Sequence, residues 1–418
     1  MKTFIFFLGT NDYKECLYEF TKEESHQTCY TQLAILKKHK NDIGKIIVFL
    51  TEDARKKNWE GVGKLKEQIK SIASINPVEV DIPNGFNNED LLGIFTRITN
   101  SIDENAELII DVTHSFRSLP ITLSSVLNYL KSTKNCKIYK IYYGAFEVLG
   151  NPRDVDNKPI EERIAPMLDI TYLDTIQEWA KAVDNLLKFG NANLLNELSQ
   201  NAIKPILIET QGKDENASTI RKIVKDLVHL TENLYTCRSK ELLAFNFDEF
   251  NKLLNSIIQN DKLLPQVISP LKKIQEKTKT FNNQNKTKNL ILLVEWCLDF
   301  NWIQQAYTLL QESIISFILE KLNQNYINED TRNSLSSAIT IYHRNIQESE
   351  WKGDKNQIKT FLNNSENNEQ IKHLINVYVN LSDCRNDINH AGYRQNSRNP
   401  DALKNEIRNY FNQVTKLI

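Results

Sequence analysis

The sequence predicts an α/β Rossmann-like domain followed by an all-α half. Over roughly the first 150 residues, short runs of β-branched and aromatic residues alternate with amphipathic segments. This alternation is typical of βαβ units, which form a parallel sheet with helices on both faces. From about Tyr172 onward the strand-like runs stop, and apolar residues recur at helical spacing. We therefore expect the chain to change from α/β to all-α architecture near that residue.

Five runs in the first part have the composition of strands. If the sheet order is 3-2-1-4-5, the first and fourth strands are neighbours, and the polar turns that follow them face one pocket. The runs are residues 2–9, 45–51, 78–83, 107–113 and 137–146.

The second part is expected to consist of long helices, broken near Gly190, Gly212 and the polar tract 281–288. That tract is the best candidate for a linker. After it, apolar residues step by threes and fours, which predicts one long helix whose apolar stripe is bundle core rather than a ligand-lining surface. The stripe comprises Leu292, Trp296, Phe300, Ile303, Tyr307, Leu310, Ile314 and Phe317.

Length and charge limit the classes of function. A chain of 418 residues with 40% hydrophobic content is long enough for two or three domains. The formal net charge is −1, so no overall basic field attracts nucleic acid. Any contact with RNA must therefore be local.

Cysteine usage predicts neither disulfides nor a metal site. The six cysteines are scattered, without a CxxC pair or a cluster at zinc-ligand spacing. The apolar run after Lys2 is too short for a signal peptide, and no window approaches the roughly 20 apolar residues of a membrane helix. We expect a cytoplasmic protein without metal, cofactor or membrane association.

The turns after the first and fourth strands form the first candidate site. Hydroxyls and free backbone N–H groups at a helix N-terminus attract anions, which suits a phosphorylated or nucleotide ligand. Only one glycine occurs in the first turn, so the GxGxxG fingerprint of redox dinucleotides is absent. In the alternative interpretation, hydroxyls of the second turn only cap the next helix and its arginine makes a surface salt bridge. The candidate ligand residues are Gly9, Thr10, Asn11, Thr113, His114, Ser115 and Arg117.

The second candidate site is an Arg-x4-His string, Arg385 to His390, near the C-terminus. Histidine can accept the proton of an RNA 2′-hydroxyl, and arginine can stabilise the charge that develops on phosphorus. Five residues of helix turn the two side chains about 140° apart, so they converge only if the helix ends near Gly392 or a second copy approaches. We favour the dimer. Asn386 would assist, and Asp387 is expected at the surface.

Together, the sequence DVTHSFR at 111–117 and a helical half ending in RNDINH at 385–390 resemble the CRISPR-associated CARF-HEPN ribonucleases of type III systems. The resemblance spans nearly the whole chain. It implies a CARF sensor domain at residues 1–171, a helical connector at 172–288 and a HEPN ribonuclease domain at 289–418.

The resemblance also implies a function. The sensor domain would bind a cyclic oligoadenylate, for which we expect the tetra-adenylate, with the hexa-adenylate as the alternative. The HEPN domain would then cut single-stranded RNA without metal, through Arg385, His390 and Asn386, and leave a 2′,3′-cyclic phosphate. A homodimer or higher oligomer is expected, without stable association with the CRISPR effector complex. Ser115 replaces the commoner glycine, which leaves cleavage of the activator ring by the CARF domain an open question.

Two alternatives remain. The chain could be a nucleotide-sensing dimer that recruits a partner and has no enzymatic activity, or a HEPN RNase toxin that a partner protein neutralises. A DNA-binding regulator is disfavoured because the helical half has mixed charge and no short basic recognition helix after a tight turn.

Overall fold

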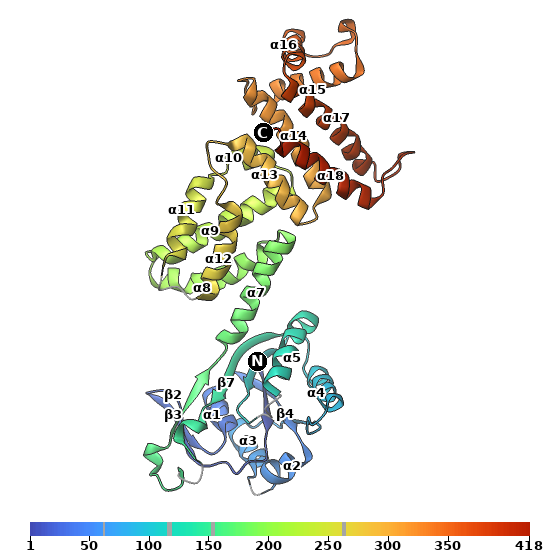
Figure 1. The fold of residues 1–418 in the computed structure, drawn as a ribbon. Helices are drawn as coiled ribbons and strands as arrows, with labels where there is room; N and C mark the ends of the chain where they lie inside the picture. Colours follow the sequence, from blue (N-terminus) through green and yellow to red (C-terminus); the bar gives the residue numbers. More distant parts are fainter. Residues whose placement is uncertain (62, 115–118, 152–154, 261–264) are drawn as a thin grey trace. The chain divides into compact units, whose positions relative to one another are not determined.

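The computed structural model describes residues 1–61, 63–114, 119–151, 155–260 and 265–418. Its internal contacts divide the chain into two compact units, Met1–Ile176 and Gln177–Ile418 (Figure 1). The division lies inside helix α7 (Tyr172–Phe189). The expected domain boundaries after residues 171 and 288 stay predictions.

Within the described residues of the first unit, eight strands form one sheet in the order β3-β2-β8-β7-β6-β1-β4-β5. The five predicted strands lie in the expected order, because β5, β4, β1, β6 and β7 follow one another with parallel pairing. The strands are β1 (Lys2–Leu8), β2 (Cys16–Thr21), β3 (Glu24–Thr28), β4 (Ile43–Leu50), β5 (Val78–Asp81), β6 (Glu107–Asp111), β7 (Lys137–Gly144) and β8 (Ile164–Asp169).

The five predicted strands form the expected parallel sheet, but the whole sheet is mixed. Three strands that the sequence did not predict extend the sheet beyond β7: β8 pairs antiparallel with β7, and β2 and β3 form an antiparallel hairpin. The hairpin is polar for much of its length, and β3 carries only one fully buried residue, Thr28. It therefore lacks the β-branched and aromatic run by which the five predicted strands were recognised.

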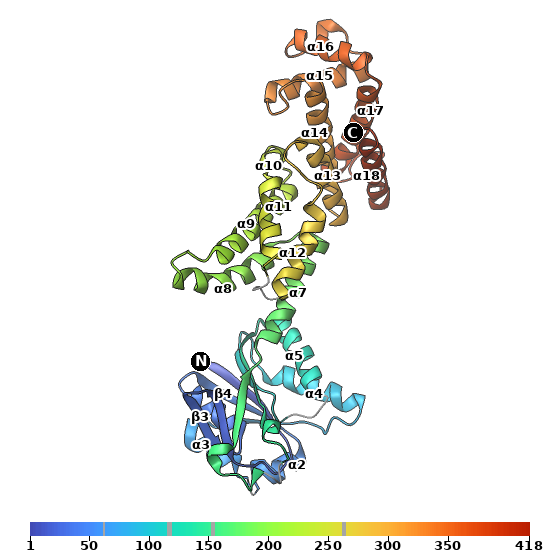
Figure 2. The same cartoon turned by 60° about the vertical axis from the view of Figure 1, so that its left-hand side comes forward.

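Helices cover both faces of the sheet (Figure 2). Successive side chains of β1 point to opposite faces, so Phe4 and Phe6 join one core and Ile5 and Phe7 the other. The first core includes α1 (Thr31–Lys38), η1 (Arg55–Trp59) and α3 (Leu65–Ala73), and the second includes α4 (Asn88–Ser101) and α5 (Leu119–Lys134). The remaining short helices are α2 (Glu52–Ala54), η2 (Phe146–Leu149) and η3 (Ile160–Glu162).

The described residues of the second unit are helical and build two apolar cores. One lies mainly among α7, α8, α9, α11 and α12, and the other mainly among α10 and α13–α18. The helices after α7 are α8 (Asn193–Glu209), α9 (Glu215–Tyr235), α10 (Ser239–Ala244), α11 (Phe247–Ile258), α12 (Pro265–Thr278), α13 (Lys286–Asp299), α14 (Ile303–Lys321), α15 (Glu329–Arg344), η4 (Glu348–Glu350), α16 (Lys355–Glu366), α17 (Glu369–Asn389) and α18 (Pro400–Thr415).

The apolar stripe of residues 292–317 belongs to the bundle core, as predicted, but it is carried by two helices instead of one. Asn301 adopts the left-handed conformation with φ of 57° and ends α13. The N–H of Trp302 donates to the carbonyl of Cys297, and the N–H of Asn301 to that of Leu298, as in a Schellman cap. Periodicity continues through this cap because both helices bury their apolar faces in the same core.

The polar tract 281–288 is packed against the bundle and is not an open linker. Phe281 is buried, with its ring between those of Phe247 and Trp296. The Asn283 side chain accepts a hydrogen bond from the N–H of Phe247 at 3.0 Å. The tract therefore joins the two cores through a fixed turn.

None of the helices in the described ranges combines the length and apolar character needed to cross a membrane. Among the same residues, no group of three or more His, Cys, Asp and Glu side chains is arranged to hold a metal ion. The six cysteines are unpaired.

Candidate functional site

The carboxyl ends of β1 and β6 open into a cavity of about 800 Å³ in the first unit. The two strands pair in parallel, with Phe6 opposite Asp111, so the turns that follow them start at the same edge of the sheet. The described lining residues are Asn11, Asp12, Tyr13, Lys14, Tyr18, Cys29, Thr113, His114, Tyr143, Gly144, Phe146, Glu147, Gly150 and Asp156.

The Asp111 carboxylate holds the second turn in place. Oδ1 accepts hydrogen bonds from the N–H of Thr113 at 2.9 Å and from its hydroxyl at 2.6 Å. Oδ2 accepts from the Thr31 hydroxyl at 2.7 Å and the Gln32 amide at 2.8 Å. Burial raises the pKa of Asp111, although these four donors favour the charged form. Asp111 therefore positions Thr113 at the cavity wall and does not face the ligand.

Thr113 can offer a ligand only an acceptor. Its hydroxyl has one hydrogen, which it donates to Asp111, and its oxygen already accepts from the N–H of Gly144 at 2.8 Å. One lone pair remains. The hydroxyl thus ties β6 to β7 and is not the free anion donor that the sequence suggested.

The first turn is fixed by Tyr13 and Asn58. The N–H of Gly9 donates to the Tyr13 hydroxyl at 3.1 Å, and a Cβ atom at Gly9 would lie 2.8 Å from that oxygen. The Asn58 side-chain amide donates to the carbonyl oxygens of Gly9 at 2.9 Å and Asn11 at 3.0 Å. Gly9 is therefore needed for close packing beneath the cavity.

His114 enters the cavity as a neutral ring. Its Nε2 is buried without a hydrogen-bond partner in the described residues, and burial lowers the pKa of His114 to about 3. The imidazole lies 4.0 Å, centroid to centroid, from the Tyr13 ring. A neutral imidazole can donate or accept one hydrogen bond at the orphaned nitrogen but supplies no positive charge for a phosphate.

The described lining carries more carboxylates than cations. Lys14, its one cationic residue, forms an ion pair with Asp156, while Asp12 pairs with Lys57 and Glu147 accepts from the Tyr143 hydroxyl. The rings of Tyr13, Tyr143 and Phe146 offer faces for planar groups instead. This part of the cavity suits bases and ribose better than phosphates.

In the second unit, Arg385 on α17 faces α14. Its Nη1 donates to Gln311 Oε1 at 3.2 Å, and the Gln311 amide nitrogen donates to the Ser382 hydroxyl at 2.7 Å. The Arg385 Nε is buried without a partner among the described residues. Arg385 lines a cavity of about 280 Å³ with Cys237, Ser239, Lys240, Leu243, Thr308, Glu312, Tyr326, Ile327 and Arg332.

His390 stands apart from that cavity. Helix α17 ends at Asn389, and the left-handed residues Ala391 and Gly392 reverse the chain after it. His390 and Asn386 are exposed, and neither belongs to the described lining of the Arg385 cavity. Helix α17 ends close to Gly392, as convergence of Arg385 and His390 requires. Within one chain, however, the two side chains do not share a described cavity.

The expectation that Asp387 is a surface residue was wrong. Its side chain is 2% exposed, and its Oδ2 accepts from the N–H of Arg398 at 2.7 Å. One turn earlier, Asp383 binds Arg394 at 2.8 Å and Arg398 at 2.9 Å, and these arginines lower the pKa of Asp383. The two aspartates fasten the segment after His390 back onto α17, which periodicity alone cannot reveal.

Comparison with known families assigns the first unit. Residues 3–147 match the family described as CRISPR system endoribonuclease Csx1, CARF domain. The N-terminal unit contains a CARF domain. The chain is also similar to CRISPR-associated protein MJ1674 of Methanocaldococcus jannaschii, with 25% identity over 294 residues, which cover 68% of this chain. The aligned part spans 41% of that protein's length.

Of the residues predicted for the CARF ligand site, Asn11, Thr113 and His114 line the cavity, and Gly9 lies beside it through Tyr13. Thr10 is exposed and is not among the described lining residues. The predictions for Ser115 and Arg117 lie outside the described residues.

Sequence reasoning missed the residues that position the site. Tyr13 and Asn58 of the CARF domain carry no motif, since their roles depend on contacts between turns far apart in the sequence. Asp111 belongs to the quoted motif, and its place at the end of an apolar strand could have indicated a buried carboxylate. Gln311 lies on a buried face of α14, where a polar side chain calls for a partner.

Proposed function

We propose that the chain is a single-stranded RNA endoribonuclease of type III CRISPR defence, activated by cyclic oligoadenylate at its CARF domain. The observation that carries the proposal is the CARF match over residues 3–147. CARF domains bind cyclic oligoadenylates as a class, and the matched family is described as an endoribonuclease. The similarity to a CRISPR-associated protein supports the same setting.

The proposed ligand would meet three kinds of surface in the CARF cavity. Adenine rings would pack on Tyr13, Tyr143 or Phe146, and base or ribose groups would bond to Asn11, the neutral His114 or the Thr113 lone pair. The described lining supplies little charge for phosphates, so those contacts are assigned to Arg117 and to backbone N–H groups. We expect the cyclic tetra-adenylate, with the hexa-adenylate as the alternative.

The proposed cleavage uses the HEPN pair. His390 takes the proton from a 2′-hydroxyl, whose oxygen attacks the adjacent phosphorus. Arg385 stabilises the charge on the phosphorane, and the bond to the 5′-oxygen breaks as that oxygen takes a proton from solvent water. The products are a 2′,3′-cyclic phosphate and a 5′-hydroxyl end. Gln311, which holds one arm of the guanidinium, acts as a positioning residue.

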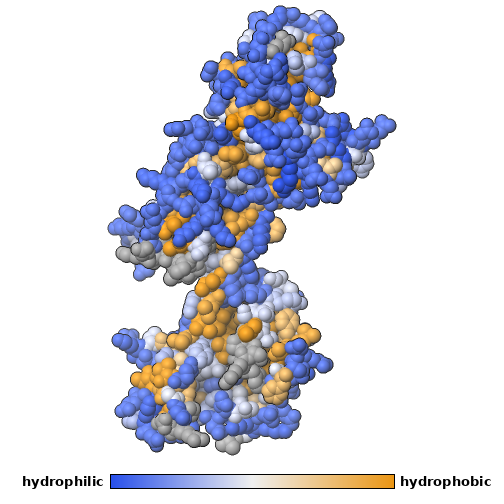
Figure 3. All heavy atoms as spheres, in the orientation of Figure 1, coloured by the Kyte–Doolittle hydropathy of each residue, from blue (hydrophilic) through white to orange (hydrophobic). Residues whose placement is uncertain are grey.

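A homodimer would complete this site. Because His390 is exposed and absent from the described lining of the Arg385 cavity, a second copy is needed to bring an arginine and a histidine together. The CARF domain also exposes apolar side chains, as Figure 3 shows in orange. Helices α4 and α5 pack against each other, and on them Leu92 and Ile121 are 66% and 76% exposed. Exposed apolar residues of this kind favour burial of this CARF surface against another protein, here a second copy of the chain.

One observation favours a second function. Since a single chain does not join Arg385 and His390 in one described cavity, the helical unit could serve only to dimerise and recruit a partner. That alternative predicts ligand binding without RNA cleavage.

The experiment that tests the proposal is cleavage of a fluorescent single-stranded RNA in EDTA. Cyclic tri-, tetra- and hexa-adenylate and linear oligoadenylate are added separately, with the His390→Ala variant as the control. Cleavage triggered by one cyclic ligand and lost in the variant supports the proposal. Ligand binding without cleavage under every condition contradicts it and favours the partner-recruiting dimer.

A further inference from the structure

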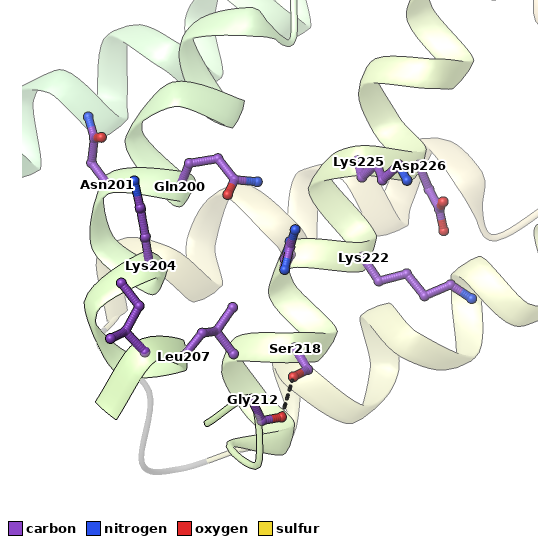
Figure 4. Close-up of a pocket in the computed structure, with 11 residues that line it drawn as sticks. Gln200, Asn201, Lys204, Leu207, Gly212, Ser218, Lys222, Lys225 and Asp226 are labelled. Carbon is purple, nitrogen blue, oxygen red and sulfur yellow. Dashed lines mark hydrogen bonds between the residues drawn. The ribbon is translucent and has the colours of Figure 1, made fainter. Parts of the chain in front are cut away.

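The chain is nearly neutral overall, yet cationic side chains gather in one groove of the second unit. Helices α8 and α9 pack against each other and border a cavity of about 1030 Å³ (Figure 4). Its described lining holds four cationic side chains and one carboxylate. These are Lys204, Arg221, Lys222, Lys225 and Asp226. No catalytic role proposed above uses any of them.

Helical spacing explains why these residues share the groove. On α9, Arg221, Lys222 and Lys225 lie within one turn of each other, while the intervening Ile223 and Val224 are buried in the core. On α8, the lining residues also recur at helical spacing, so they lie along one side of that helix (Figure 4). They are Gln200, Asn201, Lys204, Leu207 and Ile208.

Most of this positive charge is not neutralised within the chain. Lys204, Arg221 and Lys225 are exposed and form no ion pair with a carboxylate among the residues that the structure describes. Lys222 does pair with Glu249. Arg221 and Lys225 are four residues apart on one helix, a spacing at which like charges repel. A bound polyanion would relieve this repulsion and release counterions.

We propose that this groove binds the backbone of single-stranded RNA. The unpaired cations would contact phosphates, while Ile208 presents exposed aliphatic surface to base faces and the amides of Gln200 and Asn201 can bond to base edges. The cavity is far larger than one phosphate needs. This inference rests on the proposed function, because that function makes RNA the polyanion. The surface itself is separate from Arg385 and His390.

The test measures RNA binding without cleavage. In a His390→Ala background, the triple variant Lys204→Gln, Arg221→Gln, Lys225→Gln is compared with Lys272→Gln, Lys273→Gln, Lys279→Gln. The control removes the same charge from exposed lysines on and after α12 that do not line the groove. Binding of a short labelled single-stranded RNA is followed by fluorescence anisotropy over a range of salt concentrations.

We expect the groove variant to bind RNA at least about tenfold more weakly, and the control to change little. Each lost phosphate contact reduces the salt dependence of log K by about 0.7, so three contacts predict a slope about 2 shallower. Equal weakening in both variants, or none in either, would overturn the proposal. The proposal would also be overturned if an acidic peptide or inorganic phosphate bound the groove in a competition experiment and RNA did not.

Failure here is distinguishable from failure of the proposed function. With His390 intact, the groove variant should raise the KM for RNA and leave kcat unchanged, because the groove holds substrate away from the reacting atoms. An absence of cleavage in the wild-type chain, with RNA binding still lost in the groove variant, would reject the nuclease and retain the RNA-binding surface. Circular dichroism checks that both triple variants are folded.

Discussion

The CARF cavity and the Arg385 cavity differ in how much of each site one chain supplies. In the CARF domain, parallel pairing of β1 and β6 brings two distant turns to one edge, and hydrogen bonds that Asp111 accepts and Asn58 donates fix both. In the helical unit, Gln311 fixes Arg385, but His390 lies beyond the helix end and outside the described lining. A sheet assembles a site from its topology, whereas in the proposed ribonuclease site the helix end would leave part of the site to a second copy.

The largest effect should come from His390→Ala. Removing a general base typically costs about 10²–10⁴-fold in rate. We expect RNA cleavage to fall by that range, while cyclic oligoadenylate binding, measured by calorimetry, stays unchanged because the CARF residues are untouched. His343→Ala serves as the matched control, since His343 is also exposed near a helix end. Full cleavage by His390→Ala would remove the catalytic assignment.

Asp111→Asn tests whether the CARF cavity is fixed in advance. The carboxylate accepts hydrogen bonds from four donors. The asparagine side chain would replace one acceptor oxygen by an NH₂ group, whose two hydrogens would point toward groups that also donate. We expect a loss of about 2–3 kcal/mol in the free energy of unfolding of this unit, as for a buried charged hydrogen-bond network. Chemical denaturation measures it.

Thr10→Ala is the control for that change, because Thr10 is exposed and not among the described lining residues. It should alter the free energy of unfolding by less than about 0.5 kcal/mol. If Asp111→Asn is equally mild, the cavity is not held by that carboxylate.

Gln311→Leu should separate positioning from binding at Arg385. A hydrogen bond to a charged group contributes about 1.5–3 kcal/mol, so we expect kcat to fall about ten- to a hundredfold with little change in KM. Gln311→Glu, which keeps an acceptor for the guanidinium, should recover part of the rate. A parallel fall in both variants, or a change in KM alone, would contradict a positioning role.

The last prediction concerns the dependence of stability on pH. The pKa of His114 is about 3 in the folded chain and about 6.5 when unfolded, so the unfolded state binds an extra proton between these values. His114 therefore contributes stability that is present above pH 6.5 and is lost as pH falls toward 3. The His114→Gln variant should lose less stability over this window in thermal unfolding at several pH values. Identical pH profiles would contradict a buried neutral imidazole.

Sequence patterns predicted the strands that are rich in β-branched and aromatic residues. Apolar runs located β1, β4, β5, β6 and β7 and gave their order, but the polar hairpin β2–β3 at the end of the sheet has no such run. The helical periodicity of apolar residues likewise continues past Asn301, so the sequence predicted one helix where there are two. A helix cap changes the direction of the chain without changing which residues are apolar.

The candidate sites were predicted in part, and for a related reason. Motifs located the turns and Arg385, since those residues are adjacent in sequence. Contacts between distant segments, such as Asn58 with Gly9, Gln311 with Arg385 and Arg398 with Asp387, have no local signal. The burial of Asp387 follows from the last of these contacts.

The most direct test of the composite site is complementation between inactive copies. Arg385→Ala and His390→Ala chains are each assayed alone and after mixing under exchange conditions, with cyclic oligoadenylate present and mixed dimers verified by native mass spectrometry. If the cleft is shared, the mixture should cleave RNA well above either variant alone, because one mixed dimer holds one intact arginine and one intact histidine. Mixed dimers that form and remain as inactive as the separate variants would contradict the shared site.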